Sequence, residues 1–452
     1  MFENLLGQPA GEELIRDLKG GTLAPAMLFA GPPSSGKGTA ALELGRVLSC
    51  GREGAPWNCS CPSCVRYHTL VHPDLMVLGS RAFSAEIGAA AAAFQKNAGV
   101  LPARIFFVRA VRKLLLRFNP LLWEGDSDFS KLRSLVVSLE EDLDDLEALS
   151  GGEKPGEVER LCGDILKNSL ELEARGIPKY IPISRIRRAS YWCRLAPLGR
   201  GKLLLIENAD RMMEGARNAL LKILEEPPRR VTLVLAASRP EALLPTILSR
   251  LRPYRFIARD RAVEEEVIRR IFRGGLPAEV PPGLSPINAY LDSFMPVPGD
   301  ALLGLAAFFI ASAAYAAAVK LRGRGSGTLP EEITLLGKHT VSLAEAAGLG
   351  RPLGECSAAC AKILEKTGKF AVKSLLSDFL KDLLVLVSGS GIMGRGSAGI
   401  GCGEVWKKYA AEADTAALGL NQSPDLALER LFMETAEGMA ALAPAGPSRE
   451  AS

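Results

Sequence analysis

The chain reads Ala26-Met-Leu-Phe-Ala-Gly31-Pro-Pro-Ser-Ser-Gly36-Lys37-Gly38-Thr39 near its N-terminus, and this stretch decides the fold. The apolar run Ala26–Ala30 predicts a buried strand, and the pattern from Thr39 to Leu48 predicts a helix. A glycine-rich turn between a strand and a helix is the context that a phosphate-binding loop requires. Backbone N–H groups can turn inward at the glycines, and the helix N-terminus adds its positive dipole end.

The side chains of this loop predict phosphate binding more strongly than hydrolysis. Lys37 would reach the β and γ phosphates, but the next residue, where Ser or Thr would bind Mg²⁺, is Gly38, and Thr39 comes one place late. An ordinary glycine-rich turn without a ligand remains the alternative. We assign the phosphate-binding positions to Gly31, Ser34, Ser35, Gly36, Lys37, Gly38 and Thr39.

A second motif ends the apolar run Leu203–Ile206, which predicts another buried parallel strand. In an ATPase, the end of this strand carries an Asp for the Mg²⁺ shell and then a Glu that polarises the attacking water. The two positions are here Glu207 and Asn208. Asn cannot accept a proton, so we interpret the pair as a degenerate catalytic site.

Composition sets broad limits on the class of protein. The chain has 452 residues, of which 48% are hydrophobic and 23% charged, with a net charge of +4. These values predict two or three packed domains, and the weak positive charge permits nucleic-acid contact without requiring it. The opening residues Met1–Asn4 lack the basic and apolar regions of a signal peptide, so we expect a cytoplasmic protein.

Four cysteines gather in a short segment that follows the first predicted helix: Cys50, Cys59, Cys61 and Cys64. Four thiolates at such spacing predict a structural Zn²⁺ site, although the Cys-x-Cys step is tighter than usual. Reduced thiols without metal are the alternative, and His68 is a spare candidate ligand. The remaining five cysteines are scattered and are expected to be buried apolar residues.

Apolar strand-like runs alternate with helical patterns over residues 1–257, which predicts an α/β core with a parallel sheet. The strand candidates are Ala26–Ala30, Leu75–Leu78, Ile105–Val108, Leu203–Ile206, Leu233–Ala236 and Leu251–Phe256. A small lid or linker region is expected at 258–299, an all-α domain at 300–440 and a disordered tail at 441–452. The uncharged run Ala301–Val319 is long enough to span a membrane, but it is rich in Ala, so we expect a buried helix and no membrane partner.

An insert interrupts the α/β pattern at about 113–180. Its apolar positions, Leu132, Leu135, Val136, Leu139, Leu143 and Leu146, define one helix face, and the opposite face is acidic. A second apolar stripe follows the break at Gly151 and Gly152, which predicts a helical hairpin. We expect this hairpin to be a solvated decoration rather than a dedicated partner site.

Several motifs in this order resemble the bacterial clamp-loader ATPases of the AAA+ class. They are Phe2–Gln8, the loop Gly31–Lys37, the cysteine segment, His72-Pro-Asp74, the stretch Asn218-Ala-Leu-Leu-Lys-Ile-Leu-Glu-Glu-Pro-Pro228 and the stretch Leu244-Pro-Thr-Ile-Leu-Ser-Arg250. The resemblance covers residues 1–256 apart from the insert, while 300–440 resembles the collar domain of the family only in its helical character.

Within that family, the altered motifs resemble the delta-prime subunits of DNA polymerase III clamp loaders. The resemblance implies a protein that hydrolyses little or no ATP and lends Arg250 in trans to a neighbouring ATPase subunit. It also places Ser238 at the sensor-one position. The implied partners are the gamma/tau and delta subunits, with the sliding clamp and primer–template DNA reached through the complex.

Other functions remain open on the sequence. A gamma/tau-type motor subunit of the same machine is disfavoured by Gly38 and Asn208. A nucleotide kinase would also carry Gly36-Lys-Gly-Thr39, but it has no use for the Glu225–Pro228 and Ser249-Arg250 segments. A stand-alone zinc-ribbon DNA binder is disfavoured because the cysteines lie inside an ATPase-like core.

Overall fold

The structure is a computed structural model that describes residues 1–97, 100–149, 155–276, 280, 285–295, 299–323, 328–349, 360, 372–389, 396–419 and 422–443. It divides into two compact units, Met1–Phe294 and Met295–Ser452, which we describe separately. The tail predicted at 441–452 lies outside the described residues from 444 onward, and the break predicted at Gly151 and Gly152 and the residue Cys356 also lie outside them.

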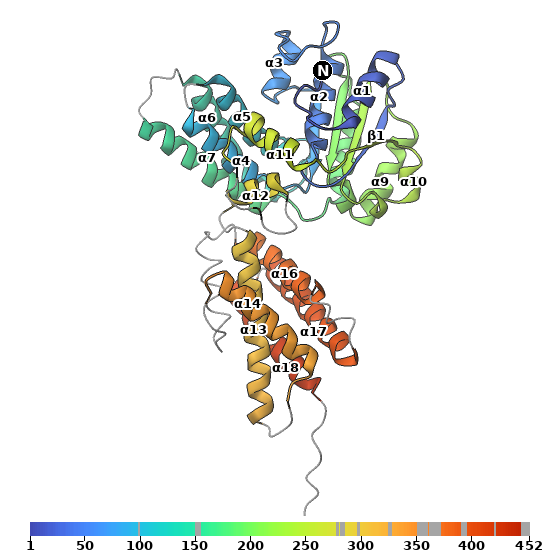
Figure 1. Ribbon diagram of the computed structural model, residues 1–452. Helices are drawn as coiled ribbons and strands as arrows, with labels where there is room; N and C mark the ends of the chain where they lie inside the picture. The colour runs from blue at the N-terminus through green and yellow to red at the C-terminus, as the bar shows by residue number, and fades with distance from the viewer. Residues whose placement is uncertain are drawn as a thin grey trace, which may run out of the picture. The chain divides into compact units, whose positions relative to one another are not determined.

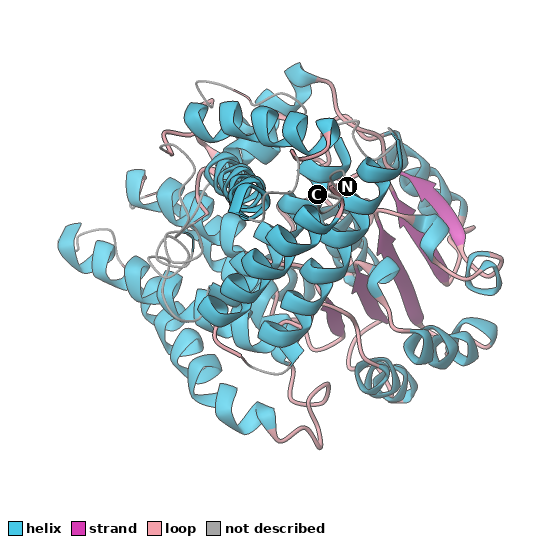
Figure 2. Ribbon diagram, turned by 90° about the horizontal axis from the view of Figure 1, so that it is seen from below, coloured by secondary structure: helices cyan, strands magenta, loops and turns pink. Residues whose placement is uncertain are grey.

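Five parallel strands form the sheet of the first unit, in the order β2-β3-β4-β1-β5 (Figures 1 and 2). Their bounds are β1 (Ala26–Ala30), β2 (Leu75–Gly79), β3 (Lys202–Glu207), β4 (Val231–Ala237) and β5 (Arg252–Arg255). Five of the six predicted strands are thereby confirmed. Gly79 lies opposite Glu207 and Ala30 opposite Ala237, so the segments that follow these strands meet at one edge of the sheet.

Alternate residues of each strand face two different hydrophobic cores. Phe29, Leu205 and Val234 pack on one face, in a core that also holds Leu14 of α1 and Leu44 of α2. The neighbouring residues Leu28, Ile206 and Leu235 pack on the other face. This alternation buries both faces of the sheet, as a parallel sheet requires.

Twelve α-helices are described in this unit: α1 (Pro9–Gly20), α2 (Lys37–Ser49), α3 (Pro62–His68), α4 (Ser84–Lys96), α5 (Leu101–Leu115), α6 (Asp128–Ala148), α7 (Pro155–Gly176), α8 (Ile183–Arg194), α9 (Glu214–Glu225), α10 (Pro245–Leu248), α11 (Arg261–Val267) and α12 (Pro286–Asp292). Local sequence explains several of their ends. Proline lies in the first turn of α1 and α12, and Gly21 ends α1 in a left-handed conformation. The Asp260 side chain caps α11 by accepting the Val263 N–H.

The strand predicted at Ile105–Val108 is wrong, because these residues lie inside α5. The short apolar run suggested a strand, but the wider pattern has a helical period. Ala103, Phe107, Ala110, Val111 and Leu114 all lie on the buried face of α5. Pro102 near the helix start is a further helix signal that the strand interpretation overlooked.

Helices α6 and α7 form the predicted hairpin, but it is more than a solvated decoration. Leu139 and Leu143 of α6 and Cys162 and Ile165 of α7 are buried in the larger core of the unit. The acidic residues are mostly exposed on the other side of α6, where Arg112 of α5 lies near Asp144 and Glu147 (3.8 and 3.5 Å). The apolar stripe therefore joins the fold, and only the acidic face is solvated.

The second unit is helical throughout its described residues. Its helices are α13 (Gly299–Gly323), α14 (Glu331–Ala346), α16 (Val372–Gly389), α17 (Gly396–Asp414) and α18 (Pro424–Ala441), with a π-helical segment at Thr415–Gly419. Phe309 of α13 contacts the rings of Phe379, Trp406 and Phe432 on α16, α17 and α18. The Ser423 side chain caps α18 by accepting the Leu426 N–H.

Helix α13 is the single described helix that is long and apolar enough to cross a membrane, and 72% of its most apolar window is buried. Leu305, Phe309 and Ala313 lie in the core of this unit. The prediction of a buried helix at Ala301–Val319 is therefore confirmed.

Candidate functional site

The predicted phosphate loop joins β1 to α2 at the carboxyl edge of the sheet. Gly36 has a φ of 95°, a backbone conformation that residues other than glycine rarely adopt, so the turn favours glycine at this position. The ammonium of Lys37 turns back onto the loop and donates to the carbonyl oxygens of Gly31 and Pro32 (2.7 and 2.6 Å). The loop therefore adopts a compact, cradle-like form.

Two elements from elsewhere in the unit cover the loop. The hydroxyl of Ser34 hydrogen-bonds Oδ1 of Asn288 in α12 (2.7 Å), and Nη1 of Arg259 donates to the Ser34 carbonyl (2.7 Å). The buried hydroxyl of Ser35 donates to the Pro32 carbonyl (2.8 Å), while Thr39 is exposed. The predicted loop residues thus lie together beneath α12 and the segment that follows β5.

The loop has backbone hydrogen-bond donors that no described protein group accepts. Within the described residues, the backbone N–H groups of Lys37 and Gly38 at the start of α2 donate to no acceptor. Burial, and then the nearby charge of Arg81, lower the pKa of Lys37 to about 8. Unused N–H groups and crowded positive charge are the properties of a site that receives an anion.

Glu207, at the end of β3, is held by arginines. Its carboxylate pairs with Nη2 of Arg117 and, at 3.1 Å, with Nη1 of Arg81, and the residue is 6% exposed. Burial works to raise the pKa of Glu207, but the charges of Arg117 and Arg81 bring it below its ordinary value. This carboxylate is therefore ionised and already has its counter-charges within the protein.

The ion pairs extend away from the loop. Nη2 of Arg81 donates to Oε2 of Glu86 (2.7 Å), and Lys113 pairs with the other oxygen of Glu86. Burial opposes ionisation of Glu86, yet Lys113 and Arg81 hold its pKa at about 2. This network was not predicted, because residues from about 113 were assigned to the insert. The available signal was the group of basic residues Arg109, Arg112 and Lys113 in α5 and Arg117 in the turn that follows it.

Gly38 and Glu207 fit one another. A Cβ added to Gly38 would lie 2.5 Å from Oε1 of Glu207, closer than real Cβ contacts allow. The glutamate thus takes the space that a Ser or Thr side chain would need. Glycine at position 38 and glutamate at position 207, which both depart from the ATPase pattern, are therefore structurally coupled.

This fit predicts the sign of a stability change. Gly38→Ala should destabilise the protein by about 1–3 kcal/mol, because the new methyl group displaces Glu207 from its arginines. Gly163→Ala is the matched control: Gly163 is also helical, nothing lies within 4 Å of its added Cβ, and the change should stabilise by about 0.5–1 kcal/mol. Urea unfolding measures both, and two changes of equal sign would contradict the interpretation.

Asn208 and Ser238 lie at neighbouring strand ends. Asn208 has left-handed backbone angles (φ 52°, ψ 47°), which Asn tolerates better than most residues. The N–H of Ser238, just after β4, donates to Oδ1 of the buried Asp210 (3.2 Å), which lies two residues after Asn208. Within the described residues, the hydroxyl of Ser238 has no hydrogen-bond partner, so its predicted role stays a prediction.

Arg250 lies apart from these groups, just after α10. Its guanidinium donates to the carbonyl of Thr246 (2.7 Å) and to Oε1 of Glu225 at the end of α9 (2.9 Å). The side chain is 34% exposed, so the contact orients Arg250 at the surface and contributes little to stability. This ion pair joins two stretches that carried the resemblance, Asn218–Pro228 and Leu244–Arg250.

The four predicted zinc ligands form one cluster at the end of α2 and the start of α3. The Sγ atoms of Cys50, Cys59, Cys61 and Cys64 lie within 4.8 Å of one another, and Cys50 and Cys59 are 3.7 Å apart. Four sulfurs bound tetrahedrally to Zn²⁺ at about 2.3 Å lie about 3.8 Å apart. The donor set and its spacing therefore fit a structural zinc ion.

Backbone N–H groups already favour one thiolate. Burial works against ionisation of Cys61, but the N–H groups of Cys64 and Gly51 lower its pKa to about 6. Burial raises the pKa of Cys64. His68 is not part of the cluster and instead contacts the ring of Trp57. Cys162, Cys193, Cys360 and Cys402 are buried elsewhere, as predicted.

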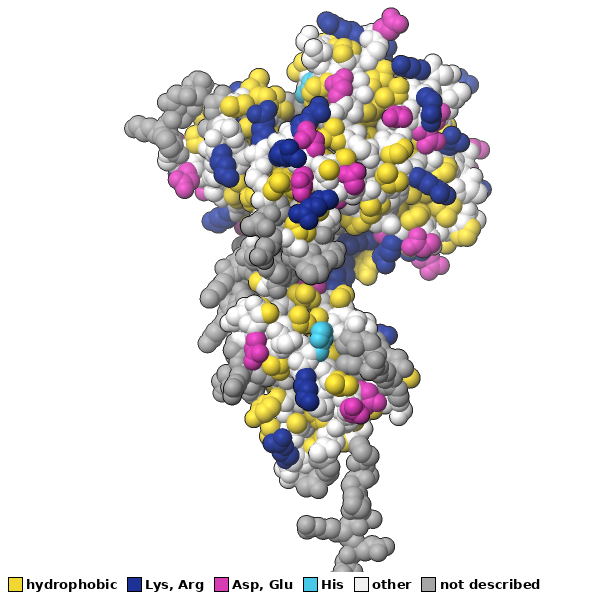
Figure 3. Space-filling view, in the orientation of Figure 1, with side chains coloured by type: hydrophobic (Ala, Val, Ile, Leu, Met, Phe, Trp, Pro, Cys, Tyr) yellow, Lys and Arg dark blue, Asp and Glu magenta, His cyan; other side chains and the backbone are white. Residues whose placement is uncertain are grey.

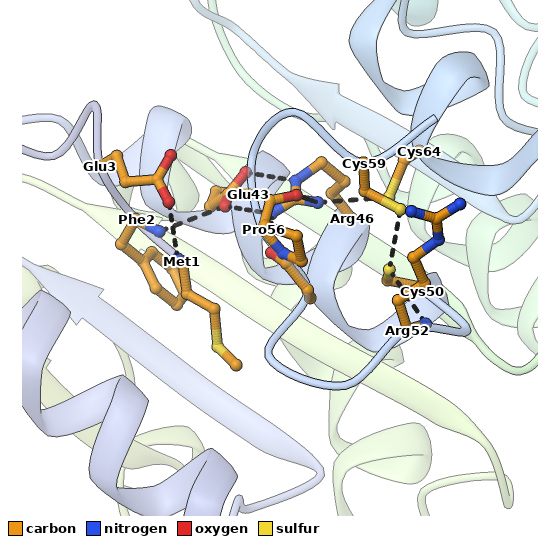
Figure 4. A network of polar contacts seen from close by, with 11 residues as sticks. Met1, Phe2, Glu3, Glu43, Arg46, Cys50, Arg52, Pro56, Cys59 and Cys64 are labelled. Atoms are coloured by element: carbon orange, nitrogen blue, oxygen red, sulfur yellow. Dashed lines mark hydrogen bonds and ion pairs between the residues drawn. The ribbon is translucent and has the colours of Figure 1, made fainter. Parts of the chain in front are cut away.

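A buried arginine connects the cysteine cluster to the N-terminal residues (Figure 4). Arg46 is 1% exposed; it donates to Sγ of Cys64 (3.2 Å) and pairs with both oxygens of Glu43 (2.7 and 2.8 Å). Oε1 of Glu43 also accepts the N–H of Phe2 (3.2 Å). Arg46 is thus a buried positive group in direct contact with one of the four cysteines, and no sequence motif pointed to it.

The parallel sheet, the loop between β1 and α2 and the polar strand ends define a protein of the phosphate-loop α/β class. A family model described as "DNA polymerase III, delta subunit" matches residues 8–117 and 141–260, slightly more than half of the chain, and the chain belongs to this family. Residues 1–7 and 261–452 lie outside the match, and the stretch between its two segments, 118–140, includes the first part of α6.

Single proteins match over shorter stretches. DNA polymerase III subunit delta' of Pseudomonas aeruginosa is 41% identical over 80 residues, which are 18% of this chain and 24% of that protein. DNA polymerase III subunit gamma/tau of Mycobacterium tuberculosis is 40% identical over 57 residues, 13% of this chain and 10% of that protein. The chain thus spans a quarter or less of the length of these relatives.

A solved structure of a DNA polymerase III gamma subunit-related protein from Thermotoga maritima is 18% identical. The match covers 58% of this chain and 81% of that one, with a TM-score of 0.24. A TM-score this low supports no inference.

Proposed function

We propose that this protein is a clamp-loader subunit of the DNA polymerase III holoenzyme that lends Arg250 to a neighbouring ATPase subunit and hydrolyses little or no ATP itself. The observation that carries the proposal is the combination of an oriented, surface-exposed Arg250 with a phosphate loop whose catalytic groups are absent. A guanidinium inserted across an interface neutralises charge that builds on the transferred phosphoryl group.

The loop geometry supports the loss of hydrolysis. Glu207 is committed to Arg117 and Arg81, Gly38 offers no hydroxyl, and Asn208 cannot polarise water. The loop residues, with Ser238 nearby, still form a site for the phosphates of a nucleotide. In this role, bound Zn²⁺ at Cys50, Cys59, Cys61 and Cys64 stabilises the fold and takes no part in phosphoryl transfer.

The rest of the chain is assigned within the same proposal. Residues 258–299 act as a lid over the loop, and the Ser34–Asn288 hydrogen bond supports this assignment. Residues 300–440 act as the collar that joins the chain to gamma/tau and delta subunits in a cytoplasmic complex. Basic and acidic side chains are interspersed on the face seen in Figure 3, so we expect the sliding clamp and primer–template DNA to be engaged through the whole complex.

The subunit role is tested by assembly. Mixed with gamma/tau and delta subunits, the full chain should co-migrate with them on size exclusion and be required for clamp loading onto primed DNA. A chain that stays alone, in a mixture where the partner subunits assemble without it, contradicts the role.

The catalytic part of the proposal predicts that the isolated chain hydrolyses ATP at no more than the background rate. Each missing positioned group typically reduces the rate by about 10²-fold or more. A coupled assay on the pure protein checks this, with Lys37→Ala as the control for contaminating ATPase. Robust turnover that disappears in Lys37→Ala would favour the gamma/tau-type motor, and transfer to a nucleoside monophosphate would favour a kinase.

A further inference from the structure

The guanidinium of Arg81 lies about as close to position 38 as the metal ion of a phosphate-loop ATPase would lie. Arg81 follows β2 at the carboxyl edge of the sheet, and its Nη1 is 3.4 Å from the Cβ that a residue other than glycine would have at position 38. A Ser or Thr there would hold Mg²⁺ at about 2.0–2.1 Å from its hydroxyl, and thus roughly 3 Å from its Cβ. The arginine therefore stands at the distance expected for the ion.

Protein groups also fill the positions of the groups that would bind Mg²⁺ in an ATPase. Oε1 of Glu207 occupies the space of the missing hydroxyl, 2.5 Å from the added Cβ of Gly38, and binds Arg81 instead of a metal-bound water. The second oxygen of Glu207 pairs with Arg117. Both carboxylate oxygens at this strand end are thus bound to protein cations.

The local charge disfavours Mg²⁺ and favours a polyphosphate. Three cations, Arg81, Arg117 and Lys113, pair with two carboxylates, Glu86 and Glu207. Glu173 also acts on Arg81, but burial raises the pKa of Glu173 and so disfavours its negative charge. A divalent cation brought close to Arg81 would be repelled. A phosphate chain in the loop would meet Arg81, Lys37 and the unused N–H groups at the start of α2, and Arg81, 37% exposed, can reach it.

We propose that the loop binds a nucleoside diphosphate or triphosphate without Mg²⁺, with Arg81 as the cation that faces the phosphates. This inference rests on the proposed function only in taking the loop as a nucleotide site, and it makes Arg81 a determinant of ligand specificity.

The test compares nucleotide binding by the full chain with and without Mg²⁺. A fluorescent ADP analogue is titrated in buffer passed over a chelating resin and then in the same buffer with added MgCl₂. No soluble chelator is used, because it would also remove Zn²⁺ from the cysteine cluster. The dissociation constants should agree within about threefold, and Lys37→Ala should abolish binding under both conditions.

Variants at position 81 locate the effect. Arg81→Ala should weaken binding by about tenfold or more without Mg²⁺, because a charge-assisted contact is lost, and added Mg²⁺ should not restore it. Arg81→Lys keeps the charge and the pairing with Glu86 and Glu207, so it should retain part of the affinity even if Arg81→Ala folds poorly. Arg133→Ala removes an exposed arginine of α6 and is the matched control.

Two results would overturn the inference: binding that appears only with Mg²⁺, and an absence of binding under both conditions. Neither would touch the subunit role, which depends on Arg250 in the assembled complex. Conversely, tight Mg²⁺-free binding by a chain that fails to join other subunits would leave the inference standing and remove the clamp-loader role.

Discussion

Replacing Arg250 by Ala should leave the protein folded and able to join its partners. The ATP site of the neighbouring ATPase subunit should nevertheless lose phosphoryl transfer. Arginine fingers contribute about 10³–10⁵ to the rate in well-studied cases, so single-turnover hydrolysis at that site should slow by about 10³-fold or more. Steady-state ATPase of the whole complex should fall by less, because the other sites still turn over. Arg250→Lys should rescue poorly, since an ammonium cannot reproduce the planar fork of donors.

Arg252→Ala is the control for this experiment. Arg252 lies two residues further along, is also exposed, and also makes one surface ion pair, with Glu13 (3.4 Å). Its loss should leave DNA-stimulated ATPase and clamp loading unchanged. Equal ATPase rates for complexes that contain either variant would show that Arg250 is an ordinary surface charge.

Loss of the metal should be the largest change in stability. Purified protein is expected to carry about one Zn²⁺, and Cys64→Ala should release it and reduce the free energy of unfolding by at least about 3 kcal/mol, because metal binding is folding free energy. Arg46 would then lose its thiolate partner while still buried. Since Arg46 shares Glu43 with Phe2, hydrogen exchange at the Phe2 N–H should speed up as well.

Elemental analysis and urea unfolding measure these effects. Cys162→Ala is the matched control, since Cys162 is also buried in the first unit but lies outside the cluster. The Cys162→Ala protein should therefore contain as much zinc as the wild-type protein. A well-folded wild-type protein that contains no metal would refute the prediction.

The sequence predicted much of the fold because its signals are local. Short apolar runs located β1 to β4, and a glycine-rich stretch between a strand and a helix located the loop at the carboxyl edge of the sheet. The same local logic failed at Ile105–Val108, where four apolar residues look alike in a strand and in a helix. Only their spacing relative to Ala103, Ala110 and Leu114 distinguishes the two.

The sequence predicted the loop and the strand ends of the candidate site, but not the ion pairs that surround Glu207. Glu207, Gly38 and Asn208 were recognised as departures from an ATPase pattern, one residue at a time. Arg81 and Arg117 are 126 and 90 residues away from Glu207 along the chain, and no short motif connects them. Ion pairs between residues far apart in the chain leave no repeating pattern in the sequence. They can be identified only once the fold has brought their residues together.

The mutual fit of Gly38 and Glu207 also constrains how this chain could evolve. On the proposed function, acquiring ATP hydrolysis by single substitutions would destabilise the protein at either first step. A side chain at position 38 collides with Glu207, and shortening Glu207 leaves Arg117 buried without its partner. We expect each intermediate to be less stable than the present sequence, and neither has a water-polarising group at position 208. On the proposed function, the coupled pair would therefore keep a subunit without ATPase activity from regaining that activity one substitution at a time.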